Sequence, residues 1–281
     1  MYFPNTVPGI LGTAVVWASS TGCNELNLIV DEGAETLAFA ALGFAEPTPV
    51  VWHVRERDLI RSTPQAPAIE AAPACPEMTA VLSGAGLDVV ADHGVWLGEL
   101  NGLEVARVGS RRGECSIDIG VGAYDQFAAA ALTPEDKDPS DSLATVVSMV
   151  RPHRSADSAP HAIGRLVRSR WLRAQLVRSP DLIGLATLDP TPLLIERPGL
   201  MENQPAAAVG ETEAGDKVLV ACTVGLDLGI AETAAGLIAL HNPDRVIVVV
   251  PPRDNHPRIV DAVATLAVPS TVVALEGEWS G

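Results

Sequence analysis

The chain has 281 residues, of which 35 are acidic and 19 are basic, so its formal net charge at pH 7 is −16. Hydrophobic residues make up 47% of the chain, which is enough for a large core and argues against disorder. A surface this acidic disfavours a protein that coats nucleic acid or an anionic membrane with basic side chains. The basic residues are arginines except for Lys137 and Lys217, a usage expected of a GC-rich bacterial genome.

The N-terminal part of the chain predicts one helix, which follows two apolar runs and precedes a strand. Apolar residues fill positions 13–18 and 26–30, and residues 32–42 have the spacing of a helix. A strand is expected over residues 50–54. Prolines among alanines then predict an extended connection, because proline fixes φ and removes a backbone donor. Pro76 is expected to open a short helix.

Residues 87–121 predict an antiparallel meander, since turn signals separate four runs of strand-forming residues. The strongest signal is Asn101-Gly102, because both central residues of a type I′ turn need positive φ. With these residues at the turn, Glu99 faces Glu104 on the neighbouring strand. Like charges in this position are unfavourable unless solvent, a cation or a metal relieves them.

Asp118 lies on the next predicted strand and adds a third carboxylate beside Glu99 and Glu104. Carboxylates on a three-stranded antiparallel sheet between helices resemble the centre of restriction-endonuclease-like metal nucleases. The resemblance implies that these three residues are metal ligands, for Mg²⁺ or Mn²⁺. Such a site usually has Lys two residues after the second acid, where this chain has Ala106, which puts catalysis in doubt. The alternative is that both glutamates lie at a solvated hairpin end.

The middle of the chain is expected to be helical over residues 124–132, 143–150 and 162–177. Residues 151–178 contain seven arginines and one acid, in contrast to the acidic remainder. One interpretation is a helix docked on its own acidic body, with arginine stems packed over apolar surface. The others are recognition of an anion or protein partner, and a local contact with nucleic acid.

The last hundred residues predict a parallel sheet. Three short apolar runs, at 218–222, 246–250 and 271–275, are separated by segments of helical length, which is typical of β-α-β-α-β. The whole chain is therefore expected to be mixed α/β, with an antiparallel meander and flanking helices in its N-terminal half. The expected units are a mixed α/β domain at 1–132, a helical connector at 133–183 and an α/β domain at 184–281, with one continuous domain as the alternative.

Two loops that leave these predicted strands carry the main candidate site, since ligands of open α/β sheets bind outside strand C-termini. The candidate catalytic residues are Asp227, Asp254 and His256, and the candidate ligand-binding residues are Gly225, Gly229, Arg253 and Glu276. A carboxylate pair with histidine can hold a divalent cation or transfer protons, and arginine can bind a phosphate or carboxylate. The alternative is that the aspartates are helix caps and the other side chains solvate a loop. Neither a phosphate-loop nor a dinucleotide motif is present, so no nucleotide cofactor is indicated.

Three functions remain open from the sequence. The leading hypothesis is a protein that binds a small anionic or metal-bound ligand at its strand ends, with hydrolysis as a possible activity. The alternatives are a non-catalytic protein-interaction or assembly protein, and a metal nuclease or its degenerate relative. No leader or membrane span is visible, so a cytoplasmic location without membrane contact is expected. Isolated cysteines at 23, 75, 115 and 222 predict neither a zinc site nor a disulfide framework.

Overall fold

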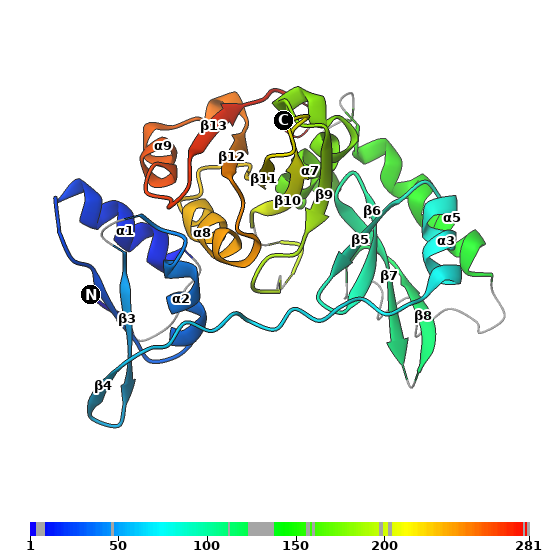
Figure 1. Cartoon of the computed structure of the whole chain (residues 1–281). Helices are drawn as coiled ribbons and strands as arrows, with labels where there is room; N and C mark the ends of the chain where they lie inside the picture. The colour runs from blue at the N-terminus through cyan, green and yellow to red at the C-terminus, as the bar shows by residue number, and fades with distance from the viewer. Residues whose placement is uncertain are drawn as a thin grey trace.

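The computed structural model has a mixed α/β architecture, as the sequence predicts. It describes residues 1–3, 9–45, 48–111, 113–122, 138–155, 158, 161–196, 199–201, 204–277 and 279. The helix expected over residues 124–132 lies outside these ranges. Within them the chain forms three β-sheets, with helices packed between and around them (Figure 1).

The first sheet, the N-terminal sheet, has the strand order β1-β2-β3-β4. Its strands are β1 (Tyr2–Phe3), β2 (Asn27–Val30), β3 (Val50–Arg55) and β4 (Asp58–Arg61), and its helices are α1 (Ile10–Ser20) and α2 (Ala34–Ala41). The apolar run at 13–18 lies inside α1, and β2, α2 and β3 match predicted segments. The sequence does not predict β4, because all four of its residues are exposed and no alternation marks it.

The second sheet is the predicted meander, in the order β5-β6-β7-β8. Its strands are β5 (Asp88–Asp92), β6 (Val95–Leu100), β7 (Leu103–Arg111) and β8 (Glu114–Ile119), and its helices are α3 (Pro76–Gly84) and α5 (Pro139–Val150), with the 3-10 turn η1 (Arg151–His153). Asn101 and Gly102 have φ of 48° and 75°, as the type I′ turn requires. Glu99 pairs with Glu104, so the register predicted next to the turn is confirmed, but the register shifts by one residue between Gly98 and Glu99.

The single helix expected over residues 162–177 is wrong, because the chain breaks into α6 (Ala162–Arg165) and α7 (Arg168–Arg178). Leu166 is extended, and Val167 takes a left-handed conformation with φ of 42°. A guanidinium nitrogen of Arg154 donates a 2.8 Å hydrogen bond to the Leu166 carbonyl, which a continuous helix would use itself. Val167 is buried in the core of the meander, so tertiary contacts override the helical pattern.

The third sheet, the C-terminal sheet, has the order β13-β12-β11-β10-β9. Its strands are β9 (Thr187–Thr191), β10 (Ala206–Glu211), β11 (Lys217–Cys222), β12 (Arg245–Val250) and β13 (Ser270–Ala274). Between them lie α8 (Gly229–His241), α9 (Pro257–Val263) and the 3-10 turn η3 (Pro252–Asp254), and η2 (Pro180–Ile183) precedes β9. The parallel pairing of β11, β12 and β13 is confirmed, whereas the antiparallel strands β9 and β10 were not expected.

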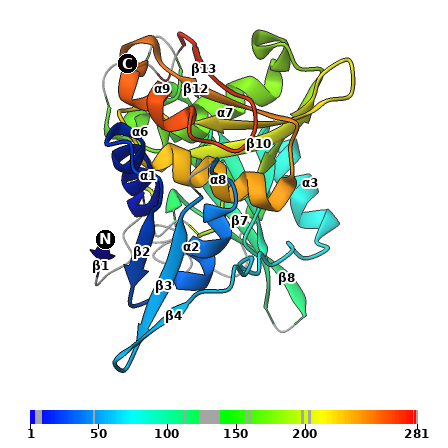
Figure 2. The ribbon, with the colours of Figure 1, turned by 60° about the vertical axis from the view of Figure 1, so that its left-hand side comes forward.

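Helices cover both faces of the C-terminal sheet. Side chains of α7 share a core with one face, while α8 and α9 cover the other face. The second of these cores also contains residues from 10 to 51, because α1 and α2 pack directly on α8 (Figure 2). A Cβ on Gly43 would lie 2.0 Å from the carbonyl oxygen of Ala235, so this close approach requires glycine. Domain borders at 132 and 183 remain a prediction.

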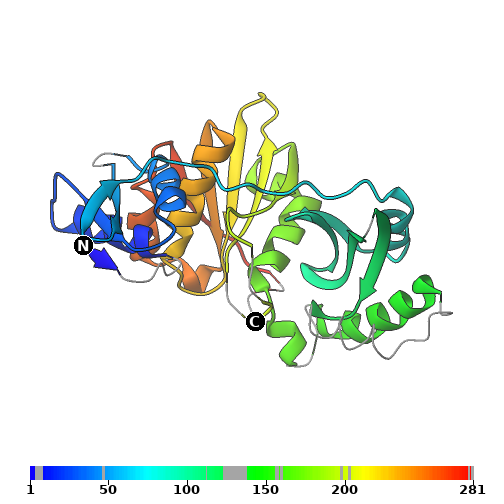
Figure 3. The same cartoon turned by 90° about the horizontal axis from the view of Figure 1, so that it is seen from below.

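An extended segment, residues 62–75, connects the N-terminal sheet to the meander along the outside of the molecule (Figure 3). It ends at Cys75, which forms a disulfide with Cys115 of β8. The expectation of no disulfide is therefore wrong for this pair, since folding brings together two cysteines 40 residues apart. Cys23 and Cys222 are free. Among the described residues, no helix combines the length and apolar character needed to cross a bilayer.

Candidate functional site

The parallel strands of the C-terminal sheet end at one edge, and the two candidate loops meet there. The amide of Gly225, after β11, donates a 2.7 Å hydrogen bond to Oδ2 of Asp254, after β12. Arg253 lies beside this contact, with its Nε 3.8 Å from Oδ1 of Asp254. The loop that carries Asp227 therefore lies against the loop that carries Asp254, as the parallel topology requires.

The beginning of α7 reaches the same edge. Oγ of Ser169 accepts a 3.2 Å hydrogen bond from the amide of Val224. Arg168 precedes Ser169, and burial lowers the pKa of its guanidinium; nearby Arg253 lowers this pKa further, while Asp254 acts in the opposite direction. Loops 223–229 and 251–257, together with Arg165, Arg168 and Ser169, make up the strand-end site.

Two of the candidate catalytic side chains accept hydrogen bonds from backbone amides at the start of a helix. Oδ1 of Asp227 accepts a 2.8 Å hydrogen bond from the amide of Gly229 at the start of α8. Nδ1 of His256 accepts a 3.2 Å hydrogen bond from the amide of Arg258 at the start of α9. Burial raises the pKa of Asp227, and the hydrogen bond from Gly229 acts against this shift. The capping alternative named Asp227 and Asp254, but Asp254 accepts its hydrogen bond from Gly225 of the other loop, and His256 caps α9 instead.

Three more residues lie near this edge, and the sequence predicts a role for only one of them, Glu276. Glu276, a candidate ligand-binding residue, follows β13 and has an exposed side chain. The hydroxyl of Thr223 is buried and has no hydrogen-bond partner among the residues that the structure describes, which the sequence does not indicate. Glu232 accepts hydrogen bonds of 2.7 and 3.2 Å from the amides of Leu11 and Gly12, so it joins α8 to the start of α1. Partners 220 residues away leave no local signal for this role.

The meander carboxylates are paired with arginines. Glu99 accepts hydrogen bonds from Arg170 at 3.1 Å and from Arg173 at 2.5 Å. Glu104 forms an ion pair with Arg107 at 3.0 Å. The repulsion expected between the facing glutamates is thus relieved by guanidinium groups, two of which come from α7, more than 70 residues further along the chain.

These contacts involve two of the three residues that the sequence proposes as metal ligands in the meander, Glu99 and Glu104. Asp118, the third of them, lies on β8 directly opposite Arg107. In the part of the chain that the structure describes, no group of three or more His, Cys, Asp or Glu side chains is arranged to hold a metal ion. The geometry of the meander therefore favours ion pairing over metal coordination at Glu99 and Glu104.

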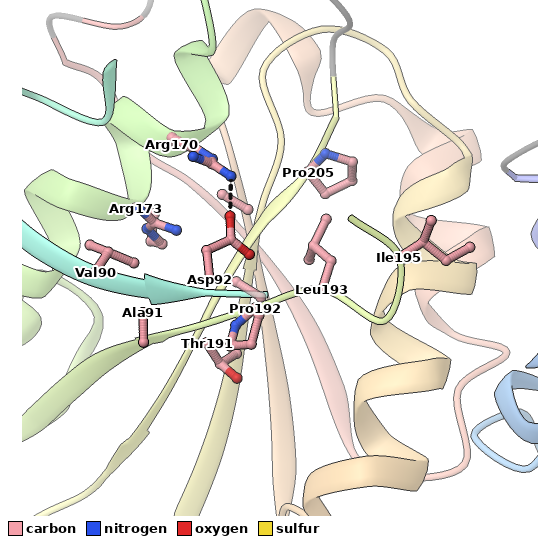
Figure 4. Close-up of a pocket in the computed structure, with 12 residues that line it drawn as sticks. Val90, Ala91, Asp92, Arg170, Arg173, Thr191, Pro192, Leu193, Ile195 and Pro205 are labelled. Atoms are coloured by element: carbon pink, nitrogen blue, oxygen red, sulfur yellow. Dashed lines mark hydrogen bonds and ion pairs between the residues drawn. The ribbon is translucent and has the colours of Figure 1, made fainter. Parts of the chain in front are cut away.

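A small pocket lies beside this ion cluster, where the meander meets the C-terminal sheet (Figure 4). Figure 4 shows Arg170 reaching Asp92, to which it donates a 2.7 Å hydrogen bond. The cavity volume is about 20 Å³, which is room for about one water molecule. Because it is this small and both its arginines are paired with carboxylates, the pocket does not suit a substrate.

Comparison with known proteins adds no relative to this description. No family model, curated protein or solved structure matches the chain.

Proposed function

We propose that this chain binds a small anionic ligand, through a phosphate or carboxylate group, at the strand-end site. The observation that carries the proposal is the hydrogen bond from Gly225 to Asp254, because it joins the exits of two parallel strands. The hydrogen bond from Val224 to Ser169 adds the beginning of α7 to the same point. Ligands of α/β sheets bind outside strand ends of this kind.

The local charge also supports an anionic ligand. Arg168 and Arg253 interact electrostatically with each other, and the side chain of Arg253 is 49% exposed. The N-terminus of α7 adds a partial positive charge next to Arg168, which stands in its first turn. Guanidinium groups bind phosphates and carboxylates through paired N–H donors. Arg168 and Arg253 are both positively charged, and an anion bound between them would reduce their repulsion. This positive site lies in a protein whose net charge is −16.

Hydrolysis at this site would require a group that transfers protons. Asp227 is a candidate, because burial raises its pKa toward the range of a general acid or base. Its Oδ1, however, is held by Gly229, and His256 is engaged in the same way at α9. We therefore propose binding as the function, and Asp227 as the first residue to test for catalysis.

A protein-interaction role is the second candidate. Only part of the arginine-rich segment, residues 151–178, would be available for it. Three of its arginines are neutralised by carboxylates of the meander. These ion pairs are Arg170–Asp92 at 2.7 Å, Arg173–Glu99 at 2.5 Å and Arg178–Asp88 at 2.6 Å. Arg165 is exposed and remains accessible to a partner.

Titration of the full chain with inorganic phosphate and with acetate, followed by calorimetry, tests the proposed function. We expect the protein to bind at least one of these anions, and Arg253→Gln to weaken this binding about tenfold. Arg57→Gln is the matched control, because it removes the same charge from an exposed position in the turn between β3 and β4. Absence of binding by the unaltered protein, or equal binding by Arg253→Gln, would reject the proposal.

A further inference from the structure

We infer that the Cys75–Cys115 disulfide is a reversible redox site, which a dithiol reduces by attack at Cys115, and that its reduction releases the strap, residues 62–75, from the meander. The strap runs along the outside of the molecule from the N-terminal sheet to α3 (Figure 3). The disulfide joins the end of the strap to the edge strand β8, so it lies on elements that do not carry the strand-end site.

The two cysteines differ in their access to solvent. Cys115 is exposed on β8, which has a neighbouring strand on one side only. Cys75 is 3% exposed and belongs to the hydrophobic core of the meander. Because a thiolate must reach the sulfur that it attacks, an external thiol reacts at Cys115, and Cys75 is the leaving group.

Reduction by a dithiol takes two exchange steps. In the first, one thiolate of the dithiol forms a bond to Sγ of Cys115, the bond between the cysteines breaks, and Sγ of Cys75 leaves and takes up a proton. In the second, the other thiol of the dithiol loses its proton and attacks its partner sulfur, which frees Sγ of Cys115 to take up a proton. The dithiol becomes a disulfide and loses two electrons and two protons, which the two cysteines gain.

The other contacts of the strap with the meander are few. The carbonyl of Glu70 accepts a 2.9 Å hydrogen bond from the amide of Gly94, and the carbonyl of Pro73 accepts a 2.7 Å hydrogen bond from the indole of Trp96. Residues 63–74 are all exposed or half-buried, and none of them belongs to a hydrophobic core. The disulfide is therefore the strongest attachment of the strap to the meander.

Breaking the disulfide favours release of the strap. In the oxidised chain the bond fixes the position of Cys75 and so limits the motion of residues 70–74. After reduction these residues regain backbone freedom, and water replaces their hydrogen bonds at small net cost. Leu82 is fully buried and keeps the rest of α3 on the meander, so the strap and the first turn of α3 move while the helix stays. Trp96, which is half-buried, then becomes more exposed.

Hydrogen exchange of the full, isotopically labelled chain tests the release, because Gly94 and Trp96 each have an N–H group bound to the strap. The amides of β11, which has neighbouring strands on both sides, report any change in global stability. We expect reduction with dithiothreitol to speed exchange at the Gly94 amide and the Trp96 indole about tenfold more than at β11. Unchanged chemical shifts of β11 show that the chain stays folded, and reoxidation with glutathione disulfide should restore slow exchange.

Variants separate the disulfide from other effects of the reductant. Cys115→Ser should show the fast exchange at Gly94 and Trp96 without reductant and should not respond to it. Cys75→Ala, which keeps a small apolar side chain in the core, provides the same comparison if Cys115→Ser does not fold. Cys23→Ser is the matched control, because Cys23 is a free cysteine outside the strap, and it should keep the full response.

Limiting glutathione followed by iodoacetamide identifies the sulfur that is attacked. Glutathione is a monothiol, so it completes only the first exchange step, and iodoacetamide then alkylates the cysteine that was released. In the Cys23→Ser variant, we expect peptide mass analysis to find glutathione on Cys115 and the alkyl group on Cys75. The reverse pattern would overturn the assignment of Cys115 as the reactive sulfur.

Two other outcomes would overturn the proposal. Exchange at Gly94 and Trp96 that rises no more than exchange at β11 would reject release of the strap. Alkylation of both Cys75 and Cys115 in the denatured, unreduced chain would show that the disulfide is absent and would reject the redox site. Neither outcome affects the anion titrations, so failure here is distinct from failure of the proposed function.

Discussion

Buried charged residues join distant parts of this chain by binding backbone groups. Arg154 is 1% exposed, donates hydrogen bonds to the carbonyls of Leu166 and Asn101, and lies with its Cζ 4.3 Å from the ring centre of Trp171. Burial lowers the pKa of Arg154 to about 10, so it remains charged at neutral pH. Its guanidinium therefore holds the meander hairpin, the break between α6 and α7, and α7 itself together.

Replacing Arg154 by methionine tests this role. The substitution keeps much of the side-chain volume but leaves the carbonyls of Leu166 and Asn101 without their donor, so we expect a loss of about 3 kcal/mol in the free energy of unfolding. Urea denaturation at pH 7 measures the effect. Arg151→Met, at an exposed position of η1, should change stability by less than about 0.5 kcal/mol. Similar losses for the two variants would contradict the assigned role.

Glu232 gives a prediction about pH. Burial raises its pKa, although the amides of Gly12 and Leu11 oppose the shift, so the folded state binds the proton more tightly than the unfolded chain does. The stability contributed by this proton is present below the ordinary glutamate pKa of 4.5 and is lost as pH rises through the folded pKa. Glu232→Gln keeps an oxygen for both amides and removes the titration.

We therefore expect the free energy of unfolding to fall less between about pH 4.5 and pH 7 in Glu232→Gln than in the unaltered protein. Urea denaturation at several pH values in this window measures the difference. Parallel pH profiles for the two proteins would show that Glu232 does not titrate in this way. Glu35→Gln, at an exposed position in the first turn of α2, is the control and should leave the profile unchanged.

The candidate site shows what residue patterns can and cannot predict. The sequence identifies Gly225, Arg253 and Asp254, because short apolar runs mark the strands whose ends carry them. It does not identify Ser169, which lies 55 residues before its partner Val224 and has no local motif. Long-range partners of this kind depend on tertiary packing, which no spacing rule contains.

At the scale of secondary-structure elements, prediction succeeded where local chemistry decides and failed where packing does. The turn at Asn101 needs only its own φ preference, and it sets the pairing of Glu99 with Glu104, whereas an irregularity between Gly98 and Glu99 shifts the register of the rest of the hairpin by one residue. β9 contains Pro190, which argues against a strand and is tolerated because β9 lies at a sheet edge. β10 contains Gly210, where a Cβ would lie 2.0 Å from the carbonyl oxygen of Thr187. Only the neighbouring strand explains that glycine.

The disulfide between Cys75 and Cys115 fixes the beginning of α3 to the edge strand β8. It closes a loop of 40 residues, and the lost entropy of the unfolded chain predicts a stabilisation of about 4 kcal/mol. Cys115→Ser should lower the free energy of unfolding by up to this amount, and a dithiol reductant should do the same to the unaltered protein. Cys23→Ser, outside the disulfide, should have little effect. Equal stability of Cys115→Ser and the unaltered protein would show that the bond is absent in solution.

The molecule as a whole places the strand-end site at the junction of separate layers. Helices α1 and α2 attach the N-terminal sheet to one face of the C-terminal sheet, and α7 attaches the meander to the other (Figure 1). The order of these layers could not be predicted, because the core that α8 and α9 share with α1 and α2 combines residues from both ends of the chain. Arginines of α7 interact with both the meander and the C-terminal sheet, since Arg170 and Arg173 form ion pairs with the meander while Arg168 interacts electrostatically with Arg253 and Asp254 at the strand ends.

Amide chemical shifts of the isotopically labelled chain, recorded during a titration with methyl phosphate, test the anion site most directly. We predict that the largest shift changes occur at Ser169, at Val224 and Gly225, and at Arg253 and Asp254, with small changes in the N-terminal sheet and the meander. Saturable changes confined to other parts of the molecule, or no changes at millimolar concentrations, would contradict anion binding at the ends of β11 and β12.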